Sequence, residues 1–283
     1  MSLLSASDLA SISRPQPPIR AFSQPPPSAD VNEDYDEIYL DTLSKIPPRD
    51  IDEFRNYLRT IPFRYKDPAP SVLGRHLATE GDVRMFFDSS VLLAVWPVAL
   101  AMVPIVRDAD MVLTSEKTYQ GVNSSSPDIS IIMYDGTKEI GSRNLGTVAL
   151  IENKGPQGLG AFRNVVRAES ERRIIATPLD WTLVTRQLRK YAAETRCRCI
   201  LCSDESDAYF FLFPADESSE QVEFLHASSD GTGSLTLREA VLFLIYYGIS
   251  KISKFTLRYV HTHLCLACRV CCYLIYCSVL ELC

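Results

Sequence analysis

Two short apolar runs, each with a charged residue at one end, place the strongest constraint on how this chain folds. The first run covers residues 127–134 and the second covers residues 147–154. Both are rich in β-branched residues, and the segment between them is polar and contains glycine, which is typical of a connection between strands. The pattern predicts two adjacent antiparallel strands in a sheet.

The second run predicts a strand whose core-facing side ends in charge. Side chains alternate between the two faces of a strand, so one face is expected to carry Val148, Leu150, Glu152 and Lys154. Charges at such positions are tolerated when they are paired, hydrogen-bonded or bound to a metal. Asp128 opens the first run and adds a second carboxylate nearby, so these residues indicate a polar site at one end of the sheet.

The same residues resemble the fingerprint of the PD-(D/E)XK nuclease superfamily, with Pro127-Asp128 followed by Glu152-Asn153-Lys154. The chain is similar to the many uncharacterised fungal members of that superfamily. The resemblance covers about residues 71 to 250. It implies an α/β fold with a restriction-endonuclease-like core, in which helices flank a mixed β-sheet in the order αβββαβ.

The resemblance also implies metal-dependent hydrolysis of phosphodiester bonds. Asp128 and Glu152 would hold one or two Mg²⁺ or Mn²⁺ ions, with Glu80 and the carbonyl of Asn153 as further ligands, because hard oxygen donors suit these ions. Lys154 would orient or deprotonate the attacking water and offset the developing negative charge. The implied partner is a nucleic acid, with DNA favoured over RNA.

A long helix is expected before the strands, because apolar residues from about 71 to 101 follow three-and-four spacing. Pro97 predicts a kink or an end within it. Glu80 lies near its start. This residue is either the metal-facing glutamate that the resemblance implies or an acid favoured there by the helix dipole.

A second helix is predicted from Thr177 to about Thr195. It begins with a hydroxyl cap, a proline at the first helical position and an acid three residues after the cap. Gln187 and Tyr191 lie on its inward stripe, one turn apart. They match the Gln-x-x-x-Tyr element of many exonuclease-like members, where they would brace the site or touch the scissile strand. The alternative is a core helix whose tyrosine packs and whose glutamine caps a neighbour.

The rest of the core follows from shorter patterns. Strands are predicted at 199–203, 209–213 and 222–226, and an apolar helix at 235–247. The glycine-containing segment 155–160 lacks the spacing of a phosphate-binding loop. It predicts a flexible loop that leaves the site.

Three regions divide the chain. Residues 1–45 are rich in serine and proline or acidic, and predict a disordered arm. Residues 46–250 form the nuclease-like domain and begin with a short helix at 51–58. Residues 251–283 form a tail that holds six of the nine cysteines. An unstructured tail or a gene-model artefact is favoured over a zinc site, because no paired metal-ligand spacing is present. A membrane-spanning tail would need a longer apolar run.

The charge and the cysteine content indicate which partners and which cellular compartment to expect. The net charge is −6, so nothing global indicates nucleic-acid binding. The first ten residues lack the basic region of a secretory signal, and the cysteines then predict reduced thiols in an intracellular protein, nuclear or cytoplasmic, with no membrane. Residues 154–198, however, carry ten basic and four acidic side chains. This segment is either a phosphate-binding surface or a solvated helix face.

Two other function classes compete with a nuclease. One is a catalytically inactive binding or scaffold module that kept the fold. Such modules lose their acidic residues readily, and this chain retains them. The other is an interaction protein that uses the proline-rich arm, with the domain as a structural support.

Overall fold

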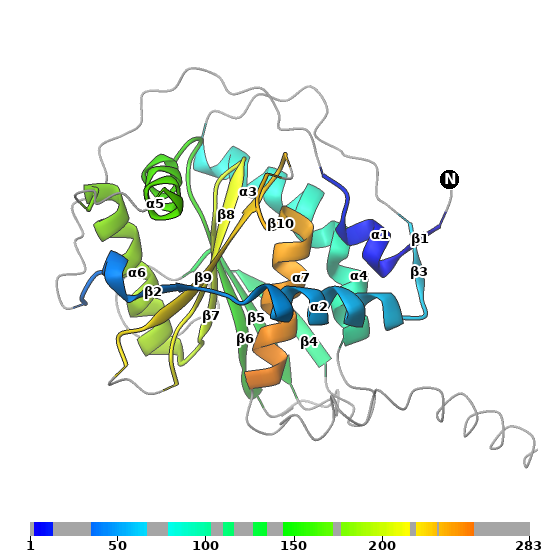
Figure 1. Cartoon of the computed structure of the whole chain (residues 1–283). Coiled ribbons are helices and arrows are strands. Elements are labelled where there is room, and N and C mark those ends of the chain that lie inside the picture. Colours follow the sequence, from blue (N-terminus) through cyan, green and yellow to red (C-terminus); the bar gives the residue numbers. More distant parts are fainter. Residues whose placement is uncertain are drawn as a thin grey trace, which may run out of the picture.

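An eight-stranded mixed sheet forms the centre of the molecule (Figure 1). The computed structural model describes residues 3–13, 35–66, 79–102, 110–115, 127–134, 144–171, 177–215, 219–230 and 232–251. Neighbouring strands follow the order β10-β9-β8-β7-β6-β5-β4, and β2 also pairs with β9. Within the described residues the chain is therefore a mixed α/β protein.

The strand bounds are β2 Leu43–Lys45, β4 Asp110–Ser115, β5 Ile129–Tyr134, β6 Asn144–Asn153, β7 Cys199–Ser203, β8 Asp207–Leu212, β9 Val222–Ser228 and β10 Leu235–Thr236. Strands β4, β5 and β6 form an antiparallel meander, and β7 then pairs with β6 in parallel. Strands β8 and β9 are again antiparallel to their predecessors. The predicted antiparallel pairing of the two apolar runs is confirmed. A small second sheet pairs β1 (Leu4–Ser5) with β3 (Arg64–Tyr65).

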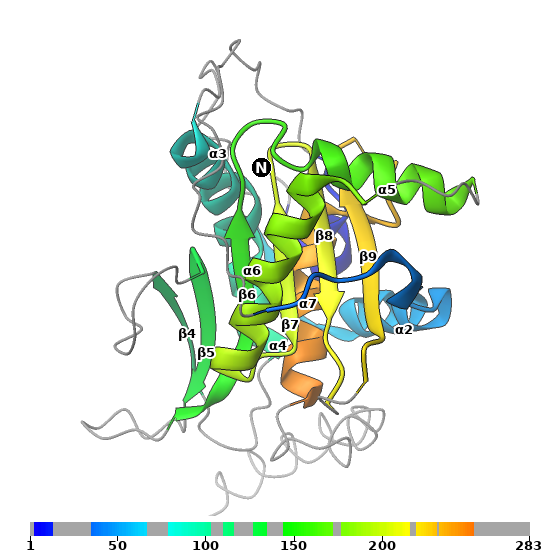
Figure 2. The same cartoon turned by 90° about the vertical axis from the view of Figure 1, so that its left-hand side faces the viewer.

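Helices cover both faces of the large sheet (Figures 1 and 2). On one face lie α1 (Ala6–Ala10), α2 (Pro48–Thr60), α4 (Leu93–Met102) and α7 (Leu237–Lys251). On the other lie α5 (Gly160–Ser170) and α6 (Leu179–Thr195). The remaining helical segments are η1 (Leu40–Thr42), α3 (Glu80–Phe87) and η2 (Asp88–Leu92). Helix α5 was not predicted from the sequence.

Each face of the sheet has its own apolar core, which explains why the central strands are apolar almost throughout. On the α7 face, the Phe243 ring lies 5.2 Å from that of Phe54 and 5.5 Å from that of Phe210. On the α6 face, the rings of Phe162 and Trp181 lie 4.5 Å apart. These aromatic contacts hold the helical layers on the sheet.

The alternation predicted for the second run is interrupted at Val148. Leu150 packs in the α6 core, as expected, but Val148 packs in the α7 core. The pairing with β5 shifts register between Ile131 and Ile132, which is a β-bulge that turns Val148 to the other face. Gly248 of α7 fits against this bulge, because a Cβ there would lie 2.0 Å from the Val148 carbonyl oxygen.

The long predicted helix runs from Glu80 to Met102 through a π-helical segment. A capping box between Thr79 and Asp82 starts it. Pro97 lies inside α4 and does not end it. By length and composition alone these 23 residues could cross a bilayer. More than half of the most apolar window is buried, however, and a core helix of a soluble protein passes the same test.

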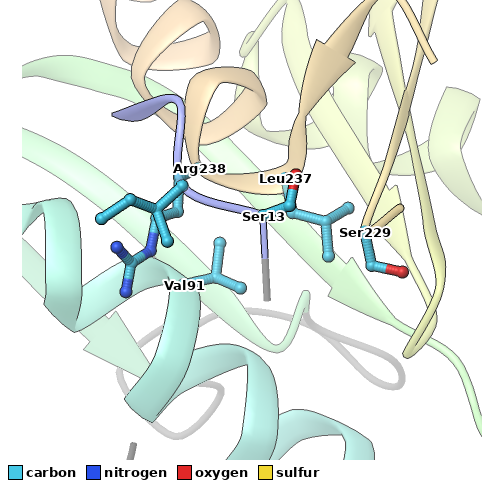
Figure 3. A pocket seen from close by; sticks show the side chains of 6 residues that line it. Ser13, Val91, Ser229, Leu237 and Arg238 are labelled. Carbon is cyan, nitrogen blue, oxygen red and sulfur yellow. The ribbon is translucent and has the colours of Figure 1, made fainter. Parts of the chain in front are cut away.

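The amino-terminal segment packs against the domain. Ala6, Leu9 and Ala10 of α1 are fully buried. Buried Arg238 donates to the carbonyl oxygens of Leu9 and Ser90. Figure 3 shows Arg238 among the side chains that line a pocket between the segment after α1, η2 and the start of α7, whose volume of about 10 Å³ corresponds to roughly one water molecule.

The prediction of a disordered arm over residues 1–45 is therefore wrong for β1, α1, η1 and β2. The prediction failed for α1 because its apolar residues pack against core residues that come much later in the sequence. Residues 14–34 and the Cys-rich tail at 252–283 lie outside the described residues.

Candidate active site

The two predicted carboxylates lie together at one end of the sheet. Asp128 directly precedes β5, and Glu152 lies near the end of β6. Their exposed fractions are only 7% and 5%. The backbone N–H of Asn153 donates to Asp128 Oδ2 at 2.7 Å, which joins the two strand ends.

Glu152 is the centre of a hydrogen-bond network that includes three of the predicted residues. Lys154 Nζ donates to Glu152 Oε1 at 2.7 Å, and Gln187 Nε2 donates to the same oxygen at 3.1 Å. The Tyr191 hydroxyl donates to Glu152 Oε2 at 3.2 Å. Lys154 also donates to Gln187 Oε1 at 2.8 Å. Residues that are 33 to 39 positions apart in sequence therefore meet as expected.

Helix α6 positions Gln187 and Tyr191 because residues four apart lie on the same side of a helix. Gln187 Nε2 donates to the Tyr191 hydroxyl at 2.6 Å, which links the pair. Trp181 Nε1 donates to the Ile38 carbonyl at 2.8 Å and anchors the start of the helix. The predicted start at Thr177 is wrong: Pro178 is the N-cap and makes no side-chain cap hydrogen bond.

Arg84 is a site residue that the sequence reasoning missed. Its Nη1 donates to Asp128 Oδ1 at 3.1 Å, and its Nη2 donates to the Asp128 carbonyl oxygen at 3.1 Å. A signal was present in the sequence. Arg84 follows Glu80 by four residues, so a helix that turns Glu80 towards the site brings Arg84 to the same side.

Glu80 lies at the edge of the site and is exposed. Its backbone is close to the segment after Lys154, because a Cβ built on Gly155 would lie 3.9 Å from the Glu80 nitrogen. Its charge contributes to the raised pKa of Glu152. Glu80 thus acts on the site through its field.

Burial and pairing set the protonation of the network. Burial, reinforced by the Asp128 carboxylate, raises the pKa of Glu152, and Lys154 opposes that rise. Burial acts to lower the pKa of Lys154, but the Glu152 carboxylate outweighs it and the net shift is upward. Burial and Glu152 also raise the pKa of Tyr191. At neutral pH Lys154 is therefore an ammonium and Tyr191 a neutral phenol, and both are donors.

The donor chemistry of the site fits a hard divalent cation. Mg²⁺ is commonly held by one or two carboxylates, and waters and substrate phosphates complete its shell. Asp128 and Glu152 supply four oxygens. Of these four oxygens, Glu152 Oε1 accepts two hydrogen bonds from the described residues and each of the other three accepts one, so those three keep a lone pair. A group of three or more His, Cys, Asp or Glu side chains suited to a metal is not found in the part of the chain that the structure describes.

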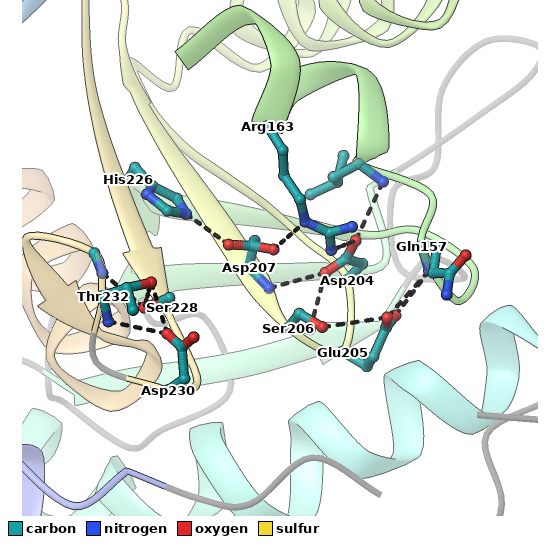
Figure 4. Close-up of polar contacts among 12 residues, drawn as sticks. Gln157, Arg163, Asp204, Glu205, Ser206, Asp207, His226, Ser228, Asp230 and Thr232 are labelled. Atoms are coloured by element: carbon teal, nitrogen blue, oxygen red, sulfur yellow. Dashed lines mark hydrogen bonds and ion pairs between the residues drawn. The ribbon is translucent and has the colours of Figure 1, made fainter. Parts of the chain in front are cut away.

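The segment after Lys154 is anchored, which contradicts the predicted flexible loop at 155–160. Figure 4 shows the turn between β7 and β8 that holds it. The backbone N–H of Gln157 donates to both Glu205 oxygens at 3.2 and 3.0 Å, and that of Leu159 donates to Asp204 Oδ2 at 3.2 Å. Arg163 of α5 donates to the same Asp204 oxygen at 2.7 Å. Two acids that follow a buried strand therefore support the segment.

The anchored segment packs closely against Lys154 at Gly158. A Cβ built on Gly158 would lie 2.7 Å from the Lys154 Cβ and 2.7 Å from the Gly155 carbonyl oxygen. The Lys154 backbone N–H donates to the Ser203 carbonyl at 2.7 Å and extends the parallel pairing. The position of the ammonium thus depends on the segment that follows it.

The basic segment is less solvated than a surface helix face would be. Lys190 is 6% exposed. Arg186 and Arg189 are half-buried, and their Nε atoms lack a hydrogen-bond partner among the described residues. Arg163 pairs with Asp204 and Asp207. Part of the local positive charge is therefore already used within the fold.

Comparisons with family models, with curated proteins and with solved structures find no match to this chain.

Proposed function

We propose that this protein is a metal-dependent nuclease built on a restriction-endonuclease-like core. The observation that carries the proposal is the convergence of Asp128, Glu152, Lys154, Gln187 and Tyr191 on one site. The order of elements also supports it. A helix, three antiparallel strands, the helix α6 and a strand parallel to β6 follow one another in the αβββαβ order that the resemblance implies, with α5 as an additional helix between β6 and α6.

Asp128 and Glu152 are the residues that would hold Mg²⁺ or Mn²⁺. When bound, the metal supplies Lewis-acid activation of water and stabilises charge on the phosphate. The backbone donor from Asn153 fixes Asp128, and the donors from α6 fix Glu152. Both carboxylates are thus preorganised without side-chain motion.

Lys154 stabilises negative charge and orients water; it does not act as a base. Its raised pKa keeps it protonated at neutral pH. Two of its three N–H groups donate to Glu152 and Gln187, which leaves one for a water molecule or a phosphate oxygen. Gln187 and Tyr191 hold Lys154 and Glu152 in register and are positioning residues.

Cleavage assays on duplex DNA, single-stranded DNA and RNA test this proposal. We expect hydrolysis with Mg²⁺ or Mn²⁺ and none with a chelator. Asp128→Asn should abolish it, and Lys154→Met should slow it by about 10²–10³-fold, as for loss of a transition-state donor. Lys66→Met removes an exposed lysine outside the site and should leave activity unchanged. Chelator-resistant cleavage, or cleavage that survives Asp128→Asn, would refute the assignment.

One observation favours a second candidate, a nucleic-acid-binding module without hydrolysis. Arg84 already neutralises Asp128 within the fold. On that basis the protein would bind nucleic acid with or without metal, and no substrate would be cut. The same assays, run beside a binding measurement, separate the two candidates.

A further inference from the structure

Arg84 lies between two carboxylates and makes unequal contacts with them. Its Nη1 is 3.1 Å from Asp128 Oδ1, whereas its Nε is 4.0 Å from Asp88 Oδ2. Its Nη2 holds the backbone carbonyl of Asp128 at 3.1 Å. A guanidinium presents five N–H donors in a rigid fork, so it can exchange one carboxylate for another by pivoting about a third contact.

Asp88 has unused capacity to accept a hydrogen bond. Its Oδ1 atom is buried and has no hydrogen-bond partner among the described residues. Burial, which Arg84 opposes, raises the pKa of this carboxyl group. A buried acceptor without a donor is unfavourable and calls for an explanation. Asp88 also opens the π-helical segment η2, and such segments are common at functional sites.

We propose that Arg84 is an internal counter-cation that competes with the divalent metal for Asp128 and pivots to Asp88 when the metal binds. The inference rests on the proposed function, in which Asp128 is a metal ligand. The Asp128 carbonyl remains available to Arg84 in both positions. The exchange replaces one charged hydrogen bond with another, so it is close to balanced.

The consequence is a site that is stable without metal and responds to metal concentration. Two buried carboxylates repel each other unless positive charge is present. Lys154 supplies it to Glu152 in both states, whereas Arg84 supplies it to Asp128 in the metal-free protein and the metal does so in the loaded protein. Arg84 therefore lowers the apparent metal affinity, and Asp88 limits how far it is lowered.

Direct Mn²⁺ binding, measured by the electron paramagnetic resonance signal of free Mn²⁺, tests the exchange without reference to activity. Thermal melts with Mg²⁺ give a second readout, because a ligand of the folded state raises its stability. Arg84→Gln should tighten Mn²⁺ binding by about tenfold, as for loss of one charged competitor. Asp88→Asn should weaken binding, because the alternative acceptor of Arg84 loses its negative charge.

The double variant Arg84→Gln/Asp88→Asn distinguishes exchange from a general field. If Asp88 acts through Arg84, Asp88→Asn should have no effect on Mn²⁺ affinity once Arg84 is replaced. Arg84→Lys keeps the charge but cannot hold two acceptors with a fork. Arg84→Lys should therefore give an Mn²⁺ affinity between those of the parent and Arg84→Gln. It replaces Arg84→Gln as the test if that variant fails to fold.

Arg55 provides a matched control. It binds the Glu239 carboxylate through Nε and Nη2 and donates to the Ser234 carbonyl. The exposed fractions of the arginine and its acid are 35% and 8%, against 29% and 9% for Arg84 and Asp128. Arg55→Gln should leave Mn²⁺ affinity unchanged.

The results of these measurements distinguish a failure of the exchange from a failure of the metal site. If the parent protein binds Mn²⁺ and Arg84→Gln does not bind it more tightly, the exchange is overturned and the metal site stands. An Asp88→Asn effect that persists in the double variant also overturns the exchange. If neither the parent nor any Arg84 variant binds Mn²⁺, both the metal site and the exchange are overturned. Binding in Arg84→Gln alone would support the exchange in its strongest form.

Discussion

Replacing Lys154 with methionine tests the central ion pair of the site. The Lys154 and Glu152 side chains are 18% and 7% exposed, and Nζ lies 2.7 Å from Oε1. Removing one member of a buried pair typically destabilises a protein by about 3–5 kcal/mol, because the other charge is left uncompensated. Gln187 and Tyr191 still donate to Glu152 in the variant. We therefore expect a loss at the lower end, about 3 kcal/mol at pH 8.

The destabilisation caused by Lys154→Met should depend on pH, because it depends on whether Glu152 is protonated. Burial already raises the pKa of this carboxyl group above its ordinary value of 4.5, and removal of Lys154 raises it further. A raised pKa favours the protonated form in the folded state. The stability that this carboxyl group contributes is then fully present below its pKa in the unfolded state, and it is lost as the pH rises through its pKa in the folded state. The difference between Lys154→Met and the parent should be small near pH 4.5 and largest above neutrality.

Urea unfolding of the full chain under reducing conditions, at pH 5 and pH 8, measures both effects. Lys66→Met is the control and should change the free energy of unfolding by no more than about 0.5 kcal/mol. Glu152→Gln combined with Lys154→Met removes both charges and should recover most of the loss. An equal loss at both pH values, or a double variant as unstable as the single one, would refute this account of the pair.

Three further predictions concern the surroundings of the site. Gly158→Ala should displace Lys154 and lower turnover by about tenfold or more, whereas Gly160→Ala, with no atom within 4 Å of the added Cβ, should not; equal rates would contradict the contact. Burial raises the pKa of Asp204 from 3.8 to about 6. The free energy of unfolding should therefore fall by about 3 kcal/mol as the pH rises through this range. Asp204→Asn should flatten that fall in unfolding titrations, and an unchanged profile would assign it to other groups. Arg189→Gln should reduce the salt slope of nucleic-acid binding by about 0.9 if it contacts a phosphate, and an unchanged slope would exclude that contact.

Local patterns predicted which side chains of the site share a face of one strand or one helix, but not that these faces meet. Glu152 and Lys154 follow from the period of two in a strand, and Gln187 and Tyr191 from the four-residue spacing in a helix. Each pattern depends only on near neighbours in the sequence. The resemblance then supplied which elements belong together, and their hydrogen bonds bring these four residues into one network.

Features that depend on distant partners were not predictable in the same way. The bulge that turns Val148 depends on the close approach of Gly248, 100 residues later in the chain. Helix α1 is ordered by a core that it helps to close, and Arg238 holds its last turn from the opposite end of the sequence. Arg84 lay within reach of a local argument, because it follows Glu80 by one helical turn.

The two cations of the site differ in how freely they can leave. Lys154 is the less exposed, and it is bound to Glu152 and Gln187 at 2.7 and 2.8 Å. Its departure would strand a buried carboxylate, so it must stay in every state of the site. Arg84 is more exposed, its contact with Asp128 is longer at 3.1 Å, and a second carboxylate lies 4.0 Å away. Since a divalent ion adds positive charge to a site that already contains two cations, the charge that yields must be that of Arg84.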